Sequence, residues 1–122
     1  MIGAPALAAN AALRGGAGLV QLFVPAPIRE PVAVLAPCAT IRTMPQTTEG
    51  LTAAVKSYQA DAVAVGPGLG SSLTATTFVE FVQQFSGPIV IDADGLNLLS
   101  TAARFDIPHA ERVVLTPHPG EM

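Results

Sequence analysis

Short apolar segments and helical segments alternate along the whole chain, and this alternation limits the possible folds more than any other feature. Residues 61–65 and 112–115 are examples of apolar runs that are too short for helices and are predicted as strands. Between such runs, apolar residues recur every three or four positions, as in amphipathic helices. A helix between two strands is the usual crossover of a parallel sheet. The sequence therefore predicts an α/β fold.

The pattern predicts five strands and five helices, without an internal repeat or a linker. We therefore expect a single domain over residues 1–122, with a five-stranded, mainly parallel sheet. Because the strands are almost continuously apolar, helices should cover both faces of this sheet. The predicted strands cover residues 18–24, 39–44, 61–65, 88–91 and 112–115, and the predicted helices cover residues 5–14, 28–36, 49–58, 73–85 and 95–101.

Composition excludes several classes of function. Half of the 122 residues are apolar and 12% are charged, which suits a buried parallel sheet. The net charge is -3, and the six scattered Lys and Arg residues form no basic patch for nucleic acid. The single Cys38 favours a reducing, cytoplasmic setting without a disulfide framework. We expect neither a secretory signal nor a transmembrane helix, because the N-terminus lacks basic residues and no apolar run reaches about 18 residues.

Three successive predicted strands end in unusual sequences. We name these segments the glycine loop (residues 66–70, G-P-G-L-G), the acidic turn (residues 92–97, D-A-D-G-L-N) and the histidine turn (residues 116–121, T-P-H-P-G-E). The carboxyl ends of parallel strands lie at one edge of a sheet, where α/β proteins bind their ligands. The three segments together therefore predict a binding rim.

The glycine loop allows positive φ angles and a close approach of the backbone to a ligand. A tight strand-to-helix turn without any ligand would explain the same residues, with Ser71 or Ser72 capping the following helix. The loop does not match the dinucleotide fingerprint G-x-G-x-x-G, because Ser71 occupies the position of the last glycine.

The acidic turn also has a purely structural interpretation. Asp94 can cap a helix that begins at Gly95, with Asn97 in the position of a capping box. This leaves Asp92 unexplained, since a carboxylate directly after an apolar strand calls for solvent, a metal-bound water or a polar ligand. Asn97 can both donate and accept hydrogen bonds, which suits a carboxamide or a hydroxyl group.

In the histidine turn, prolines on both sides of His118 hold the backbone and present the imidazole rigidly. An ordinary surface histidine is the alternative, and Glu121 can simply stabilise the start of a helix. If His118 is functional, we expect it to donate a hydrogen bond to a ligand near neutral pH. A metal ligand is not expected, because no cysteine or second histidine has a suitable spacing to it.

Four blocks of the sequence resemble the ADP/ATP-dependent NAD(P)HX dehydratases, a family with the ribokinase-like fold. The first block covers residues 3–20 and begins Gly3-Ala4-Pro5, and the other three are V-G-P-G-L-G, D-A-D-G-L-N and L-T-P-H-P-G-E at residues 65–70, 92–97 and 115–121. The blocks occur in the family's order and span the whole chain.

The resemblance implies a three-layer α/β/α ribokinase-like domain, of which this chain is the N-terminal and central part. It also implies repair of the hydrated cofactors NADHX and NADPHX, in which ADP or ATP, with Mg²⁺, phosphorylates the added hydroxyl and phosphate is eliminated. Residues that match Ala4, Gly68 and His118 contact the hydrated cofactor in the family. Further candidates from the same blocks are Asp94, Asn97, Gly120 and Glu121.

The family's glycine-rich G-G-S start, its lysine-containing nucleotide segment and its G-T-G-D loop with the catalytic aspartate have no match in these residues. We therefore expect the substrate-side part of the enzyme, without catalytic residues and without turnover on its own. We also expect uncovered apolar surface and self-association as a homo-oligomer.

Two alternative functions stay open, a ribokinase-like kinase of a small vitamin alcohol and a non-catalytic nucleotide-binding module. Preferences for ADP or ATP and for NADHX or NADPHX are not set by the sequence.

Overall fold

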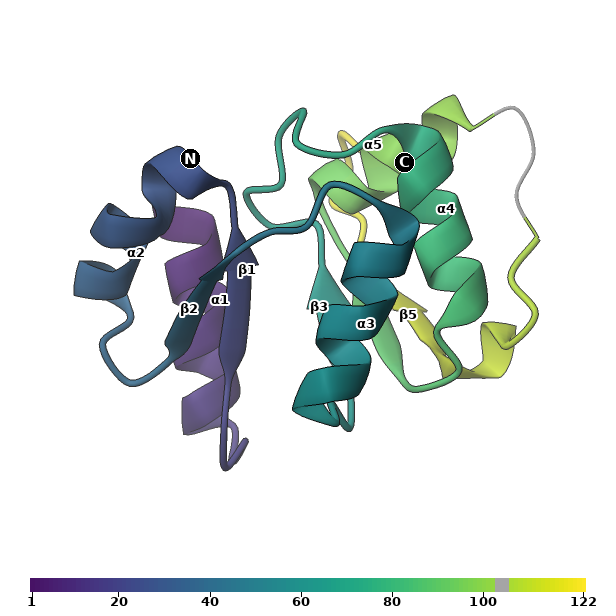
Figure 1. Ribbon diagram of the computed structural model, residues 1–122. Helices are drawn as coiled ribbons and strands as arrows, with labels where there is room; N and C mark the ends of the chain where they lie inside the picture. The colour runs from purple at the N-terminus through teal and green to yellow at the C-terminus, as the bar shows by residue number, and fades with distance from the viewer. Residues whose placement is uncertain (103–105) are drawn as a thin grey trace. The chain divides into compact units, whose positions relative to one another are not determined.

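The computed structural model describes residues 1–102 and 106–122, and the chain divides into two compact units (Figure 1). Unit 1 comprises Met1–Met44 and unit 2 comprises Pro45–Met122. The predicted alternation of strands and helices is confirmed, with boundaries shifted by a few residues. None of the helices in the described ranges has the length and apolar character needed to cross a membrane.

Unit 1 contains a pair of parallel strands with two helices. Strand β1 pairs with β2 so that Gln21 lies opposite Thr40. Pro5 stands in the first turn of α1, where its missing N–H costs no helical hydrogen bond. The elements are α1 (Gly3–Arg14), β1 (Gln21–Val24), the 3-10 turn η1 (Ala26–Ile28), α2 (Arg29–Leu35) and β2 (Thr40–Thr43).

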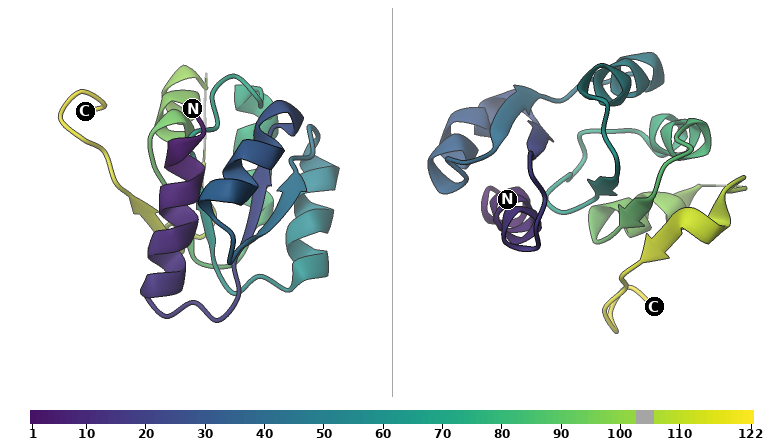
Figure 2. Two further views of the ribbon diagram at one scale, coloured as in Figure 1. Left: turned by 90° about the vertical axis from the view of Figure 1, so that its left-hand side faces the viewer. Right: turned by 90° about the horizontal axis from the view of Figure 1, so that it is seen from below.

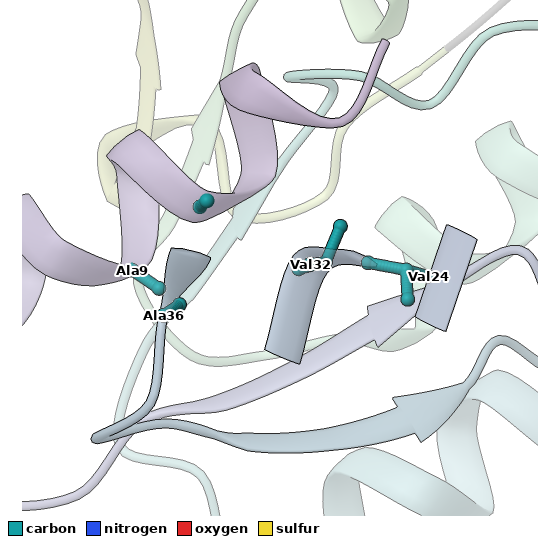
Figure 3. Close-up of a cluster of buried hydrophobic side chains, with 5 residues drawn as sticks. Ala9, Val24, Val32 and Ala36 are labelled. Carbon is teal, nitrogen blue, oxygen red and sulfur yellow. The ribbon is translucent and has the colours of Figure 1, made fainter. Parts of the chain in front are cut away.

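The core of unit 1 is built from small and β-branched side chains. Ala9 of α1 and Ala36 after α2 are almost fully buried, and Figure 3 shows them close together. Val32 of α2 and Val24 of β1 are buried in the same cluster. Alanines at these positions let α1 and α2 approach each other closely, which explains the Ala-rich sequence of α1.

Unit 2 contains three parallel strands in the order β3-β4-β5. Helices α3 and α4 lie side by side, and α5 packs against α4 (Figures 1 and 2). Strand register places Ile91 between Val65 and Leu115. The elements are α3 (Thr48–Tyr58), β3 (Val63–Val65), α4 (Ala75–Gln84), β4 (Ile89–Ile91), α5 (Asp94–Thr101), the 3-10 turn η2 (Ala110–Arg112) and β5 (Val113–Leu115).

The apolar stripe of α4 forms the core of unit 2. Phe78 and Phe81 are buried, and the Phe85 ring stacks on Phe81 with centroids 6.1 Å apart. Ile89 and Ile91 of the central strand β4 are buried as well. These two positions alternate with Val90, so they share one face of the strand.

The expected single five-stranded sheet is wrong, because the described strands form two separate parallel sheets of two and three strands. Alternation of elements predicts the direction of each crossover, but it does not predict which strand edges join. The opposite face of the unit 2 sheet is also apolar, with Val90 37% and Val114 54% exposed at paired positions. Uncovered apolar surface was expected, and this face is one place where the described chain exposes it. Leu7, Leu19 and Val34 of unit 1 are exposed as well.

Helix α4 is capped by Thr74 and not by Ser71 or Ser72. The Thr74 hydroxyl accepts a hydrogen bond from the N–H of Thr77 at 3.1 Å. The glycine loop is therefore followed by a short irregular segment before the helix begins.

We expect Thr74→Ala to lower the free energy of unfolding by about 1 kcal/mol, the usual value of a helix cap. Urea denaturation followed by circular dichroism measures this change. Thr76→Ala is the matched control, because Thr76 is exposed inside α4 and alanine favours helix there. Equal destabilisation by both substitutions would contradict the capping role.

Candidate functional site

The glycine loop adopts the backbone conformations that its glycines predict. Gly66, Gly68 and Gly70 have φ angles of 123°, 74° and 57°. Side chains larger than hydrogen are disfavoured at such angles. Inside the loop, the N–H of Leu69 donates to the carbonyl oxygen of Gly66 at 2.9 Å. The Leu69 side chain is buried, which anchors the loop to the core.

Gly66 is required for contact between two loops. A Cβ atom on Gly66 would lie 1.7 Å from the carbonyl oxygen of Asp92, which is far inside van der Waals contact. Gly95 is also close, since its own Cβ would come within 3.3 Å of the Gly66 Cα. The close approach that the sequence suggests therefore occurs, but at Gly66 it is backbone against backbone.

Asp94 does not cap its own helix. Its Oδ2 accepts a hydrogen bond from the N–H of Gly70 at 2.8 Å, whereas the start of α5 has no side-chain cap. The predicted capping role is thus wrong, because the carboxylate bonds across to the glycine loop instead. Asn97 is exposed on α5, and its N–H donates to the Ala93 carbonyl at 3.2 Å.

Ala93 has a strained backbone that the sequence did not indicate. Its φ of 48° and ψ of -121° are unusual for a residue with a Cβ atom. The strained residue is held inside a tight turn, in which the Gly95 N–H donates to the Asp92 carbonyl at 2.9 Å. Such strain costs on the order of 1–3 kcal/mol and is concentrated at functional sites.

Two polar groups at this edge have no partner in the described part of the chain. They are the half-buried carboxylate of Asp92 and the N–H of Gly68. One is an acceptor and the other a donor, so together they can bind a ligand that carries hydroxyl or amide groups.

The histidine turn is closed by two hydrogen bonds between His118 and Glu121. The Glu121 N–H donates to the His118 carbonyl at 2.9 Å, and the His118 N–H donates to Glu121 Oε2 at 3.1 Å. The bond to the Glu121 carboxylate is that of a capping box, and Pro119 stands directly after the cap, where proline is favoured, so these contacts fit the helix start that the sequence suggested.

The imidazole of His118 is held by its own turn. Its Nδ1 accepts the N–H of Gly120 at 2.9 Å, which places the proton of the neutral ring on Nε2. Nε2 lies 3.3 Å from Oε1 of Glu121, whose side chain is only 10% exposed. Gly120 and Glu121 therefore orient the histidine, which is 68% exposed and accessible to a ligand. The sequence placed these residues in one block but did not indicate their contacts.

The glycine loop and the acidic turn lie together at one edge, as predicted, whereas ligand binding at this edge stays a prediction. The glycine loop contacts the acidic turn directly, and β5 carries the histidine turn to the same edge, where the Thr116 N–H donates to the Ile91 carbonyl. Beyond Thr116, the turn extends away from the sheet, and the contacts of its polar groups stay within the turn (Figure 2). Ala4 belongs to unit 1, in the first turn of α1, and is half-buried. Convergence of Ala4, Gly68 and His118 on one ligand stays a prediction.

The charges at the rim are negative. Its ionisable groups are the carboxylates of Asp92, Asp94 and Glu121 together with His118. Within the described residues, no group of three or more His, Cys, Asp or Glu could hold a metal ion. The rim's three carboxylates repel phosphate oxygens, so the rim suits an uncharged part of a ligand better than a phosphate.

A separate groove of about 290 Å³ lies between α3 and α4, lined among others by Lys56, Phe81 and Phe85. None of the residues of the glycine loop, the acidic turn or the histidine turn lines it. It lies near the C-terminal ends of the two helices, so it is not the site that the strand ends form.

A comparison with protein families matches residues 1–122 to the model described as NAD(P)H-hydrate dehydratase. The chain belongs to this family. A curated relative from Gloeobacter violaceus, named bifunctional NAD(P)H-hydrate repair enzyme Nnr, is 38% identical over 122 residues. An Escherichia coli protein of the same name is 38% identical over 121 residues. Each alignment covers 98% of this chain but only 24% and 22% of the relative, so the chain spans about a quarter of their length.

Two solved structures resemble this chain in fold. A ribokinase-like superfamily protein from Enterococcus faecalis matches with a TM-score of 0.78 and 26% identity. Bacillus subtilis YxkO, described as a putative kinase, matches with a TM-score of 0.65 and 29% identity. Each match covers at least 98% of this chain and 42% of the other, so the chain has part of a ribokinase-like α/β fold.

Proposed function

We propose that this chain supplies the part of an NAD(P)H-hydrate dehydratase, a lyase, that binds the hydrated cofactor NADHX or NADPHX. The N–H of Gly68, which has no partner among the described residues, carries the proposal. It lies in a loop whose sequence resembles a family block and whose ends are fixed by neighbouring residues. A fixed backbone donor at the carboxyl edge of a parallel sheet is a typical ligand contact of α/β proteins.

The geometry suggests how such a ligand is recognised. The Gly68 N–H would donate to a carbonyl or hydroxyl oxygen, and the Nε2–H of His118 is a second donor that can turn from Glu121 to the ligand. The Asp92 carboxylate can accept from a hydroxyl or an amide. Ala4 is proposed on the family match alone, while Asn97 and Gly120 are further candidates from the matched blocks.

ADP or ATP with Mg²⁺ is part of the proposed activity, and it supplies the phosphoryl group that makes the added hydroxyl a leaving group. The rim carries three carboxylates, which repel phosphate oxygens, so we assign no step of phosphoryl transfer to its residues. We propose that the nucleotide site and the catalytic base lie on residues outside these 122.

A cytoplasmic location and self-association are further proposals. The exposed side chains of Val90 and Val114 support self-association.

The direct test is a calorimetric titration of the purified chain with NADHX, with NADH as the comparison ligand. We expect His118→Ala to weaken binding of NADHX by about 1–3 kcal/mol, the usual cost of losing a hydrogen-bond partner in a desolvated site. His109→Ala is the matched control, because His109 is exposed and lies outside the rim, with Glu111 as its ion-pair partner at 3.8 Å. It should leave affinity unchanged.

Two results would count against the proposal. Equal affinity for NADHX in the wild-type and His118→Ala chains would remove His118 from the site. A wild-type chain that binds neither NADHX nor NADPHX would refute the proposed function itself.

A further inference from the structure

We propose that Asp94 is a positioning residue, which fixes the glycine loop through Gly70 and keeps the Gly68 N–H aimed at the ligand. Asp94 itself need not touch the ligand. The part of this inference that concerns binding rests on the proposed function, whereas the part that concerns the loop does not.

The glycine loop is held at three points. Gly66 lies against the Asp92 backbone, the Leu69 side chain is buried, and the Gly70 N–H donates to Asp94 Oδ2. Gly68 lies between these points, and its own N–H has no partner within the described residues. Its direction is therefore set by the residues on both sides of it.

The bond from Gly70 to Asp94 is the only one of the three that a side-chain substitution can remove without changing the loop's own residues or the backbone of the acidic turn. At 2.8 Å it has the length of a hydrogen bond to an ionised carboxylate, the stronger kind of hydrogen bond in proteins. Removal of the carboxylate leaves the Gly70 N–H to water, so the C-terminal half of the loop gains freedom.

The acidic turn is shaped to make this bond. An aspartate at the start of a helix ordinarily stabilises its own helix, by capping or through the helix dipole. Here the capping bond is absent, and Ala93 adopts a strained conformation directly before Asp94. The strain at Ala93 and the bond across to Gly70 both indicate that the turn presents Asp94 to the glycine loop.

Positioning makes a distinct prediction for two substitutions of one residue. Asp94→Ala removes the acceptor, whereas Asp94→Asn keeps a side-chain oxygen that can accept the same N–H. If Asp94 only positions the loop, Asp94→Asn should therefore keep ligand binding. If the negative charge must lie next to the ligand, Asp94→Asn should lose binding as Asp94→Ala does.

The first experiment follows amide hydrogen exchange at Gly70 by NMR in the ¹⁵N-labelled chain. We expect exchange in Asp94→Ala to be faster by roughly tenfold or more, as for the loss of a charge-assisted hydrogen bond, and close to wild type in Asp94→Asn. Asp92→Ala is the control, since it removes a neighbouring carboxylate that has no partner in the described chain. The proposal is overturned if Asp94→Ala leaves Gly70 exchange unchanged, or if Asp92→Ala accelerates it equally.

The second experiment titrates the same variants with NADHX, after circular dichroism has shown that they are folded. Affinity should fall by about tenfold in Asp94→Ala and stay within about threefold of wild type in Asp94→Asn. Unchanged affinity in Asp94→Ala would overturn the role in binding. The role would also be overturned if both variants lost affinity equally while Asp94→Asn kept the slow exchange of the Gly70 N–H. A wild-type chain that does not bind NADHX would refute the proposed function, while the exchange experiment would still decide whether Asp94 fixes the loop.

Discussion

Replacing Gly66 by alanine is expected to lower the free energy of unfolding by about 3–5 kcal/mol, because two costs add. The first is backbone strain, since a φ of 123° is unfavourable for any residue with a Cβ atom. The second is a clash, since that Cβ would lie 1.7 Å from the Asp92 carbonyl oxygen. The clash is with backbone, so no side-chain rotation relieves it. Urea denaturation of the purified chain, followed by circular dichroism, measures the loss.

Gly70→Ala is the matched control for this prediction. Gly70 also has a positive φ, 57°, but a Cβ atom there would have no neighbour within 4 Å. Only strain remains, and the cost should be about 1 kcal/mol. If Gly66→Ala were no more destabilising than Gly70→Ala, the close packing of the two loops would be contradicted.

The elements of the fold were predictable because each depends on local sequence. Apolar periodicity identified α4 and its buried stripe of phenylalanines, and the short apolar runs identified the strands. The division into two sheets was not predictable, since hydrogen bonding between strands far apart in sequence leaves no local pattern. An apolar residue in β4 can pack against a helix or remain partly exposed, as Val90 does. The residue type is the same in both cases, so the sequence does not distinguish them.

The site was predictable at the level of segments and not of contacts. Three strand ends were expected at one edge because parallel strands share a direction, and the structure places them there. The partner of Asp94 was missed because the local capping pattern competes with a bond 24 residues away in the chain. Ala93 gave no signal, because alanine is not a residue type that indicates a positive φ.

The same distinction applies to the histidine turn. Its sequence showed a rigidly held imidazole, which the structure supports through the bond from Gly120 and the position of Glu121. The prolines on either side of His118 set the backbone, but the orientation of the ring depends on residues further along the turn. Glu121 therefore both accepts the His118 N–H, as a residue near a helix start does, and lies beside the imidazole that it orients.

Gly68→Val is expected to abolish binding of NADHX, which means a loss of at least about 100-fold in affinity, or about 2.7 kcal/mol. The substitution acts in two ways. A branched side chain occupies the space through which a ligand must approach the Gly68 N–H, and a φ of 74° is strongly disfavoured for valine, so the N–H also changes direction. Calorimetric titration with NADHX measures the loss, on a chain shown to be folded by circular dichroism.

Gly70→Val separates these two effects. It introduces the same side chain at a similar φ two residues away, where nothing lies within 4 Å and where the N–H donates to Asp94 and not to the ligand. It should carry comparable backbone strain but weaken binding far less, because it leaves the approach to Gly68 open. If both valine variants lost affinity equally, the loss would come from strain in the loop as a whole. If Gly68→Val bound NADHX like the wild type, Gly68 would not be a ligand contact, and the proposed function would lose the observation that carries it.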